Sequence, residues 1–348
     1  MKQVKIIVAL VAGLFAFTSA QAGEMSVTGS MHATYQTEVD DVTGNPLGMN
    51  TDLTFTGTTD TDFGEAKWTM GTDGTFVGDA GADHKLTLAT GYGTFKVGNS
   101  GDSANAVDDI TPTAFEEANG AGSGTYSADI GSGLEGSMSL GYNMGDIMGT
   151  GVSVDYTYYP QLDGTLNNEK GASGTQTNAN AIKGSVQSIN VGLPLAGIQG
   201  VGDSIVGGTK ITLGYEKADS LIDNQQAKEG GTVAVVVPVG PLKVGFQKKG
   251  YQNAGTAAGG DHVWYKDEIY GIAYAINDDL AVSYNMIESL KGNKAGATGN
   301  VEQETKAINL AYTVGGLTLA FQDAKTDNAG YVNAVSDDTR TISIKTAF

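Results

Sequence analysis

Polar and apolar residues alternate one by one along most of this chain. Between Met25 and Tyr35 the odd positions carry Met, Val, Gly, Ala and Tyr, and the even positions carry Ser, Thr and His. Successive side chains of a β-strand point to opposite faces of a sheet, so this period of two predicts strands with one polar and one apolar face. The alternation recurs at Leu53–Phe55, Ala66–Met70, Leu86–Leu88, Phe95–Val97, Val152–Tyr158, Ile211–Tyr215, Ile272–Tyr274, Ala281–Met286, Ile308–Tyr312 and Leu317–Phe321. No segment has the pattern of a three-turn amphipathic helix, and we expect an all-β protein.

The connections between the predicted strands are short and long in turn. Longer polar loops separate short turns at Gly91-Tyr92-Gly93, Pro238 to Pro241, Asn277-Asp278-Asp279 and Gly315-Gly316. Short turns at one end and long loops at the other are typical of transmembrane β-barrels. A soluble β-sandwich would also alternate, but it would bury its apolar face against a second sheet. Charged and hydroxyl residues on one face of nearly every strand favour a barrel with an aqueous lumen.

The number of strands is constrained by parity. The alternating segments give an odd number of candidates, whereas single-chain bacterial barrels have an even number of strands. One candidate between Ala118 and Lys210 must therefore be wrong, and Tyr126 to Ile130, Leu134 to Tyr142 and Val152 to Tyr159 compete there. We predict a 16-stranded antiparallel barrel, which is wide enough to leave an aqueous channel.

The chain begins with the pattern of a secretory signal peptide. Lys2 and Lys5 precede an apolar run over residues 6–17, and Ala20-Gln21-Ala22 provides a cleavage site. The run is too short for a membrane-spanning helix, which needs roughly 20 apolar residues, so an N-terminal anchor fits less well. We expect residues 1–22 to be removed and residues 23–348 to form the barrel.

Composition excludes several other classes. The chain has no cysteine, which rules out disulfide frameworks and thiolate chemistry. Its formal net charge of −19 argues against nucleic acid as a partner, because nucleic-acid affinity depends on Lys and Arg that neutralise phosphates. An acidic, exported, all-β chain remains.

The last eight residues alternate once more and end on an aromatic side chain. This segment, Thr341 to Phe348, resembles the closing strand of outer-membrane proteins. In those proteins the barrel assembly machinery recognises a terminal Phe with apolar residues at alternate positions before it. The resemblance therefore implies that Phe348, Ile344 and Ile342 form the assembly signal.

Three further stretches resemble the general bacterial porin family. They are the opening strand Val27 to Tyr35, the motif Leu53-Thr54-Phe55-Thr56-Gly57 followed by Phe63-Gly64, and Gly91 to Asn99. The resemblance implies a water-filled channel in the outer membrane, surrounded by lipid and lipopolysaccharide, for passive diffusion of small hydrophilic solutes and ions. It also implies a homotrimer.

In porins the third external loop folds inward and narrows the pore, with acidic residues on the loop opposite basic residues on the wall. Here the corresponding segment, residues 98–124, contains no basic residue. The alternative interpretation is a solvated acidic surface loop. The resemblance favours a constriction loop with acids at Asp102, Asp108, Asp109, Glu116 and Glu117.

The predicted basic wall departs from the family pattern. Asp52 and Asn99 stand where porins often have arginine. Alternation instead puts Lys67, Lys85 and Lys96 on the polar faces of neighbouring strands, although the same lysines could lie solvated near a rim. Acidic constrictions favour cations. Five acids against three lysines therefore predict a cation-preferring pore.

Two other classes compete with a channel. A barrel enzyme would need a catalytic group, and Ser30 and His32 share one strand face, but isolated Ser-x-His spacing is weak evidence. A structural or adhesive barrel with little conductance is the other alternative. We expect no cofactor; Ca²⁺ could bind acidic pairs such as Asp108-Asp109, but no Asp-x-Asp-x-Asp-Gly loop is present.

Overall fold

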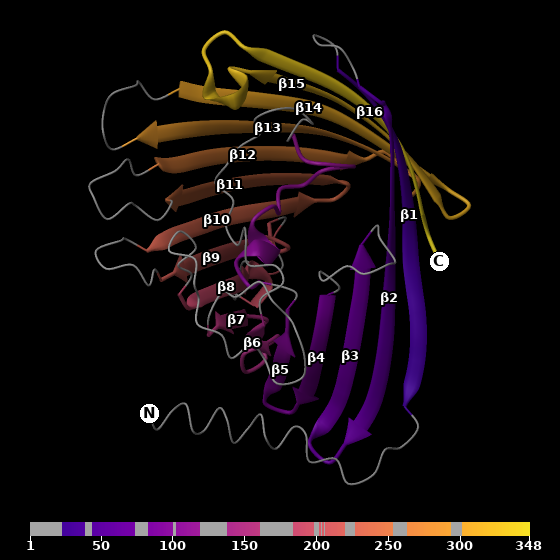
Figure 1. Cartoon of the computed structure of the whole chain (residues 1–348), viewed down its shortest axis with the longest axis vertical. Helices are drawn as coiled ribbons and strands as arrows, with labels where there is room; N and C mark the ends of the chain where they lie inside the picture. The colour runs from indigo at the N-terminus through magenta and orange to yellow at the C-terminus, as the bar shows by residue number, and fades with distance from the viewer. Residues whose placement is uncertain are drawn as a thin grey trace, which may run out of the picture.

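The computed structural model describes residues 23–38, 44–73, 83–99, 102–118, 138–160, 184–197, 202, 204, 206–219, 227–252, 263–293 and 301–348. These residues form one closed antiparallel barrel of 16 strands, as the sequence predicts (Figure 1). Each strand pairs with its neighbours in the sequence, and β1 pairs with β16 to close the ring. None of the helices in these ranges is long and apolar enough to cross a membrane.

The first eight strands are β1 (Glu24–Glu38), β2 (Leu47–Thr61), β3 (Gly64–Asp73), β4 (Asp83–Thr90), β5 (Gly93–Gly98), β6 (Ser139–Met144), β7 (Ser153–Tyr159) and β8 (Val186–Pro194). The others are β9 (Lys210–Ala218), β10 (Lys228–Val239), β11 (Leu242–Gln252), β12 (Val263–Ala275), β13 (Leu280–Asn293), β14 (Val301–Val314), β15 (Leu317–Asp327) and β16 (Ser336–Ala347). Short 3-10 helices occur at η1 (Asn105–Val107), η2 (Leu195–Gly197) and η3 (Ala329–Tyr331).

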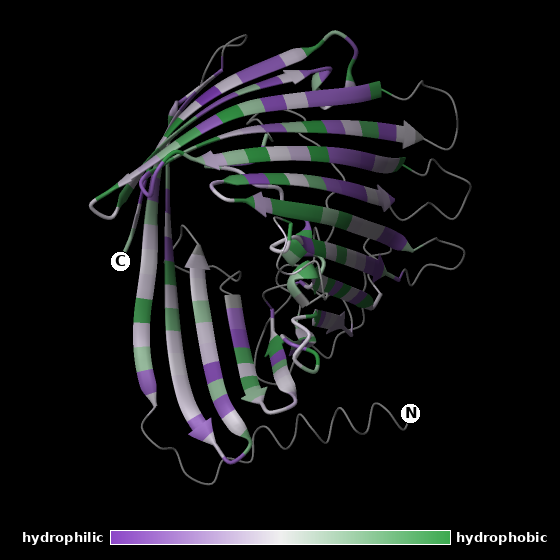
Figure 2. Ribbon diagram, turned by 180° about the vertical axis from the view of Figure 1, so that it is seen from behind, coloured by the Kyte–Doolittle hydropathy of each residue, from purple (hydrophilic) through white to green (hydrophobic). Residues whose placement is uncertain are grey.

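The strands place apolar side chains outside and polar side chains inside. In β14, Ile308, Leu310 and Tyr312 are exposed on the outer surface, while Asn309 between them is fully buried. Bands of hydrophilic and hydrophobic residues also follow one another along many of the other strands (Figure 2). A water-soluble protein buries its apolar face, so this reversed order suits a barrel whose outer surface meets lipid.

The C-terminal residue completes the closure of the barrel. The backbone N–H of Phe348 donates to Gly29 O (2.9 Å), and Gly29 N–H donates to Phe348 O (2.8 Å). A Cβ at Gly29 would lie 2.7 Å from the Phe348 ring, so the ring would have to shift if a larger residue stood there. Phe348, Ile344 and Ile342 are all exposed on the outer surface. Their recognition by the assembly machinery stays a prediction.

The connections between strands also follow the sequence pattern. The short turns after β2, β4, β10, β12 and β14 lie at the end where β1 begins and β16 ends. Gly315 and Gly316 take φ values of +56° and +85°, which glycine adopts without strain. One detail differs: Pro238 is paired within β10, so the turn there is only Gly240-Pro241.

Three candidate strands compete between Ala118 and Lys210, and two of them overlap strands of the barrel. The candidate at 134–142 overlaps β6 (Ser139–Met144), and the candidate at 152–159 overlaps β7 (Ser153–Tyr159). The competing candidate at 126–130 lies outside the described residues, as does the predicted signal peptide at 1–22. Residues 134–137, at the start of the candidate that overlaps β6, also lie outside the described residues.

Candidate pore constriction

The segment that follows β5 lies against the polar inner face of the barrel. We call its described part, residues 102–118, the loop segment. The ribbon of this segment runs inside the ring of strands (Figure 1). Its first residues bind β7 and β8: Ser188 Oγ donates to Asp102 Oδ1 (2.6 Å), and Ser103 Oγ donates to Asp155 Oδ1 (2.5 Å). Asp102 Oδ1 also accepts from the N–H of Ala104 (2.7 Å), which shapes the turn into η1.

The middle of the loop segment is held by β11. The Gln247 amide accepts a hydrogen bond from Ile110 N–H (3.1 Å) and donates to Val107 O (3.0 Å). Two positions further, Lys249 Nζ lies 3.2 Å from Asp108 Oδ2 and 3.1 Å from Asp109 Oδ1. The side chains of Lys249 and Asp108 are 0% and 4% exposed, so their ion pair is buried between loop and wall, whereas the Asp109 side chain remains exposed.

The last part of the loop segment continues across β12 to β15. Asn285 Nδ2 donates to Pro112 O (3.0 Å), and Gln322 Nε2 donates to Glu117 O (2.9 Å). A Cβ at Gly271 would lie 2.7 Å from the backbone oxygen of Pro112, so the wall needs glycine beneath this part of the loop. Side-chain amides thus satisfy backbone groups that would otherwise be buried without partners.

Solved structures share this barrel. No protein-family model matches the sequence, and no curated protein matches it either. The trimer form of OmpT, an outer membrane protein of Vibrio cholerae, superposes with a TM-score of 0.66 at 12% identity over 94% of this chain and 100% of that one. The chain has the fold of the bacterial outer-membrane porins. An anion-selective porin from Comamonas acidovorans matches at TM-score 0.64 and 14% identity over 94% of this chain and 100% of that one. OmpF of Salmonella typhi, in complex with daunomycin, matches with a TM-score of 0.65 at 12% identity. The match covers 94% of this chain and 98% of that one.

Within this porin fold the five predicted loop acids have different surroundings. Asp102 and Asp108 are only 6% and 3% exposed and face the wall. Asp109 and Glu116 are exposed, and Glu117 is half-buried. Burial raises the pKa of Asp102 against the effect of the Ser188 hydrogen bond. Of the five loop acids, Asp109, Glu116 and Glu117 are therefore the ones that are not fully buried.

The three predicted wall lysines lie on the inner face but do not bind the loop segment. Lys96 forms an ion pair with Asp155 of β7. Lys67 and Lys85 are paired in register with Thr87 and Thr69, and neither forms an ion pair with another described residue. The lysine that does bind the loop acids is Lys249, which the sequence analysis missed. Alternation places it on the inner face of β11 but gives no sign of its partner.

Glu117 provides a titrating group at this site. Burial, together with the nearby Asp109 carboxylate, raises its pKa from an ordinary 4.5 to about 8. Glu117 is therefore protonated at neutral pH and gains a negative charge as the pH rises through 8. We expect the cation-to-anion permeability ratio to rise between about pH 6 and about pH 10. Reversal potentials in a salt gradient measure this change. In Glu117→Gln the rise should disappear, and an unchanged pH profile in that variant would contradict the assignment.

Proposed function

We propose that this chain is an outer-membrane porin through which small hydrophilic solutes and ions diffuse passively. The observation that carries the proposal is the polar inner wall with the loop segment bound along it, inside a barrel whose outer surface is apolar. Such a lumen holds water, and a loop across it sets the narrowest part of the path. The proposal includes export by the signal peptide, with cleavage after Ala22.

We further propose that the pore prefers cations. The exposed Asp109 and Glu116 and the titrating Glu117 carry the acidic side of the constriction. Lys67 of β3 and Lys85 of β4 are basic groups on the inner wall. One similar porin is described as anion-selective, so the fold alone does not determine the sign of selectivity. The charges at the narrowest part of the pore determine whether cations or anions pass more easily.

A channel also fits the inner face better than a barrel enzyme. Ser30 Oγ donates to Asp52 Oδ2 (3.0 Å) and so does not pair with His32 on its own strand. His32 Nε2 lies 2.6 Å from Ser343 Oγ instead, but Ser343 is only 1% exposed and offers no access to a substrate. In the ranges that the structure describes, no three His, Asp or Glu side chains are placed to hold a metal ion.

The proposed partners follow from the same fold. We propose a homotrimer, which the trimer form of the Vibrio cholerae protein supports. Outer-membrane lipid and lipopolysaccharide would cover the apolar outer surface. The barrel assembly machinery would insert the chain by its C-terminal strand, whose Phe348 lies on the outside of the closed barrel.

A bilayer recording tests the proposed channel. Purified mature protein, with its start at Gly23 checked by intact mass, is added to a planar bilayer under a salt gradient. We expect the conductance to increase in steps. We also expect a reversal potential whose sign shows that cations pass more easily than anions. A folded, heat-modifiable protein that inserts without conducting would overturn the channel in favour of a structural barrel. A reversal potential of the opposite sign would overturn the cation preference alone.

A further inference from the structure

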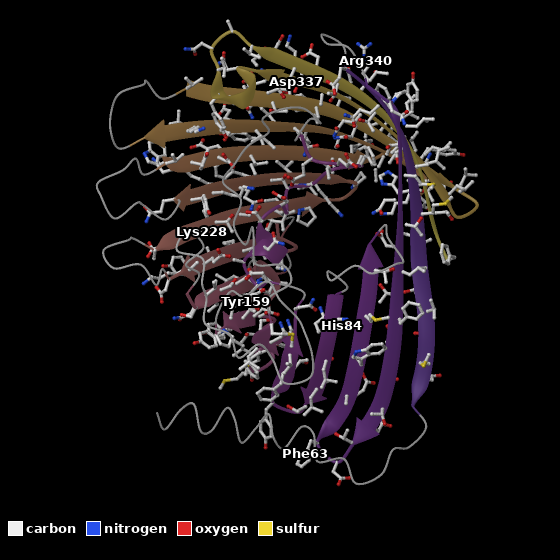
Figure 3. All side chains as sticks on the ribbon, in the orientation of Figure 1. Phe63, His84, Tyr159, Lys228, Asp337 and Arg340 are labelled. Atoms are coloured by element: carbon white, nitrogen blue, oxygen red, sulfur yellow. The ribbon has the colours of Figure 1, made fainter. Side chains whose placement is uncertain are left out.

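A row of lysine and tyrosine side chains crosses the inner wall at the long-loop end of the barrel. Tyr251 of β11 and Tyr265 of β12 are directly paired, and Tyr265 is paired with Lys291 of β13. Their positions alternate with outward residues such as Lys266, so they share the inner face with Lys228 of β10. Lys228 lies at the loop end of its strand (Figure 3). The row is not visible in the sequence, because its members come from separate strands.

A further tyrosine joins the row from the connection between β15 and β16. The Tyr331 ring of η3 lies 5.8 Å from the Tyr265 ring, centroid to centroid, at an interplanar angle of 52°. Lys291 Nζ lies 5.8 Å from the Tyr265 centroid and 5.4 Å from the Tyr331 centroid. The two tilted rings and the ammonium group therefore form one cluster, which we call the Lys–Tyr cluster.

Tyr331 has an unfavourable backbone conformation that its hydrogen-bonded surroundings hold in place. Its φ of +61° lies in the left-handed region, which bulky residues rarely adopt. Its hydroxyl lies 2.7 Å from Ser289 Oγ, and the preceding N–H of Gly330 donates to Gln303 Oε1 (2.9 Å). Strained backbone that surrounding contacts hold in place is concentrated at functional sites.

Among the residues that the structure describes, no carboxylate forms an ion pair with the lysine of the cluster. Lys291 forms no ion pair with a residue in the described ranges. The nearest acid on the inner face of β12, Asp267, is fully buried and accepts a hydrogen bond from Ser289 Oγ. Lys291, Tyr265 and Tyr331 are each only partly buried. The lumen therefore meets aromatic faces beside an ammonium group that pairs with no described carboxylate.

We propose that the Lys–Tyr cluster, with Lys228 and Tyr251 beside it, binds anionic sugars that enter from the long-loop side. The apolar face of a sugar ring would lie on the tyrosine rings, and its phosphate or carboxylate would bind Lys291 and Lys228 through charge-assisted hydrogen bonds. This proposal rests on the proposed channel only for the route by which the solute reaches the site. Contact at the mouth selects one class of solute, whereas loop charges act on small ions at the constriction, so the two preferences coexist.

Binding is tested first without conduction, by calorimetry on folded, detergent-solubilised protein with glucose 6-phosphate, glucose and inorganic phosphate as probes. We expect measurable heat for glucose 6-phosphate and weaker binding for the other two probes. Lys291→Gln should weaken glucose 6-phosphate binding by about tenfold, which corresponds to the loss of one charge-assisted hydrogen bond. Tyr331→Ala should weaken it while leaving phosphate binding unchanged, and Tyr331→Phe should retain most of it.

The matched control is Lys266→Gln. Lys266 is on the same strand as Tyr265 and also lies over an aromatic ring, 5.4 Å from the Trp264 centroid, but on the outer face. This variant should bind as the original chain does. Equal binding of phosphate and glucose 6-phosphate, or equal losses in Lys266→Gln and Lys291→Gln, would overturn the site. Glucose 6-phosphate binding in a protein that does not conduct would uphold the site and reject the channel, and block of the ionic current by the same sugar would support both.

Discussion

Replacing Lys249 with methionine should release the loop segment from the barrel wall. The substitution leaves the Asp108 carboxylate, whose side chain is 4% exposed, buried without its cationic partner. Breaking a buried ion pair from one side costs roughly 3–5 kcal/mol. Because the loop segment is bound to a wall that stays folded, we expect this cost to appear as loop detachment. Single-channel recordings should show larger and noisier conductance, and a protease should cleave the loop segment faster than in the original protein.

The control for this prediction is the neighbouring residue on the other face of the strand. Lys248 forms an ion pair with Glu268 on the outer surface, and both side chains are well exposed. Such surface pairs contribute about 1 kcal/mol or less, so Lys248→Met should leave conductance unchanged. Adding Asp108→Asn to Lys249→Met should restore part of the original behaviour, because the buried charge is then gone. Original conductance and protease resistance in Lys249→Met would show that the ion pair does not hold the loop.

Removing two loop acids should reduce the cation preference more than removing any distant pair. In the double variant Asp109→Asn with Glu116→Gln, the constriction loses two carboxylates that a passing ion would otherwise meet. A unit charge at about 4 Å in water contributes about 1 kcal/mol, which corresponds to about a fivefold change in a permeability ratio. We therefore expect the cation-to-anion ratio, measured from reversal potentials, to fall by about fivefold or more. Lys67→Gln with Lys85→Gln should change the ratio in the opposite direction.

The matched control removes the same number of charges elsewhere. Asp278 and Asp279 are exposed in the short turn between β12 and β13. Charges further away than the Debye length of about 8 Å at physiological salt are largely screened. Replacing both with asparagine should therefore leave the ratio nearly unchanged. Equal effects of the two double variants would mean that overall charge, and not the loop segment, sets the preference.

The strands and their faces could be predicted from local pattern alone. Alternation identified Ile308, Leu310 and Tyr312 as one face of a strand, and these residues do lie on the outer surface. Glycine pairs such as Gly315-Gly316 marked the tight turns correctly. These features are local, because a period of two and a positive φ depend only on neighbouring residues. Between 118 and 210 the pattern was ambiguous, since more segments alternate than the barrel can accommodate.

The partners of the loop could not be predicted in the same way. Lys243 and Lys249 both point inward from β11, and nothing in their local sequence distinguishes them. Lys249 meets Asp108 across 141 residues of chain because the loop segment follows a particular path over the wall. The same path buries Asp102 and Asp108 and leaves Asp109 and Glu116 exposed, although all four carboxylates look alike in the sequence.

By itself the sequence determined strands that follow one another around a barrel, each with an apolar outer face and a polar inner face. Each of these properties follows from side-chain periodicity and chain order, which pairing between neighbouring strands preserves. Only the tertiary structure decided which polar residues carry free charge. That depends on desolvation and on partners brought together across the lumen, as when burial beside Asp109 raises the pKa of Glu117 to about 8. It is also why the row of Tyr251, Tyr265 and Lys291 is visible only once the strand register aligns them.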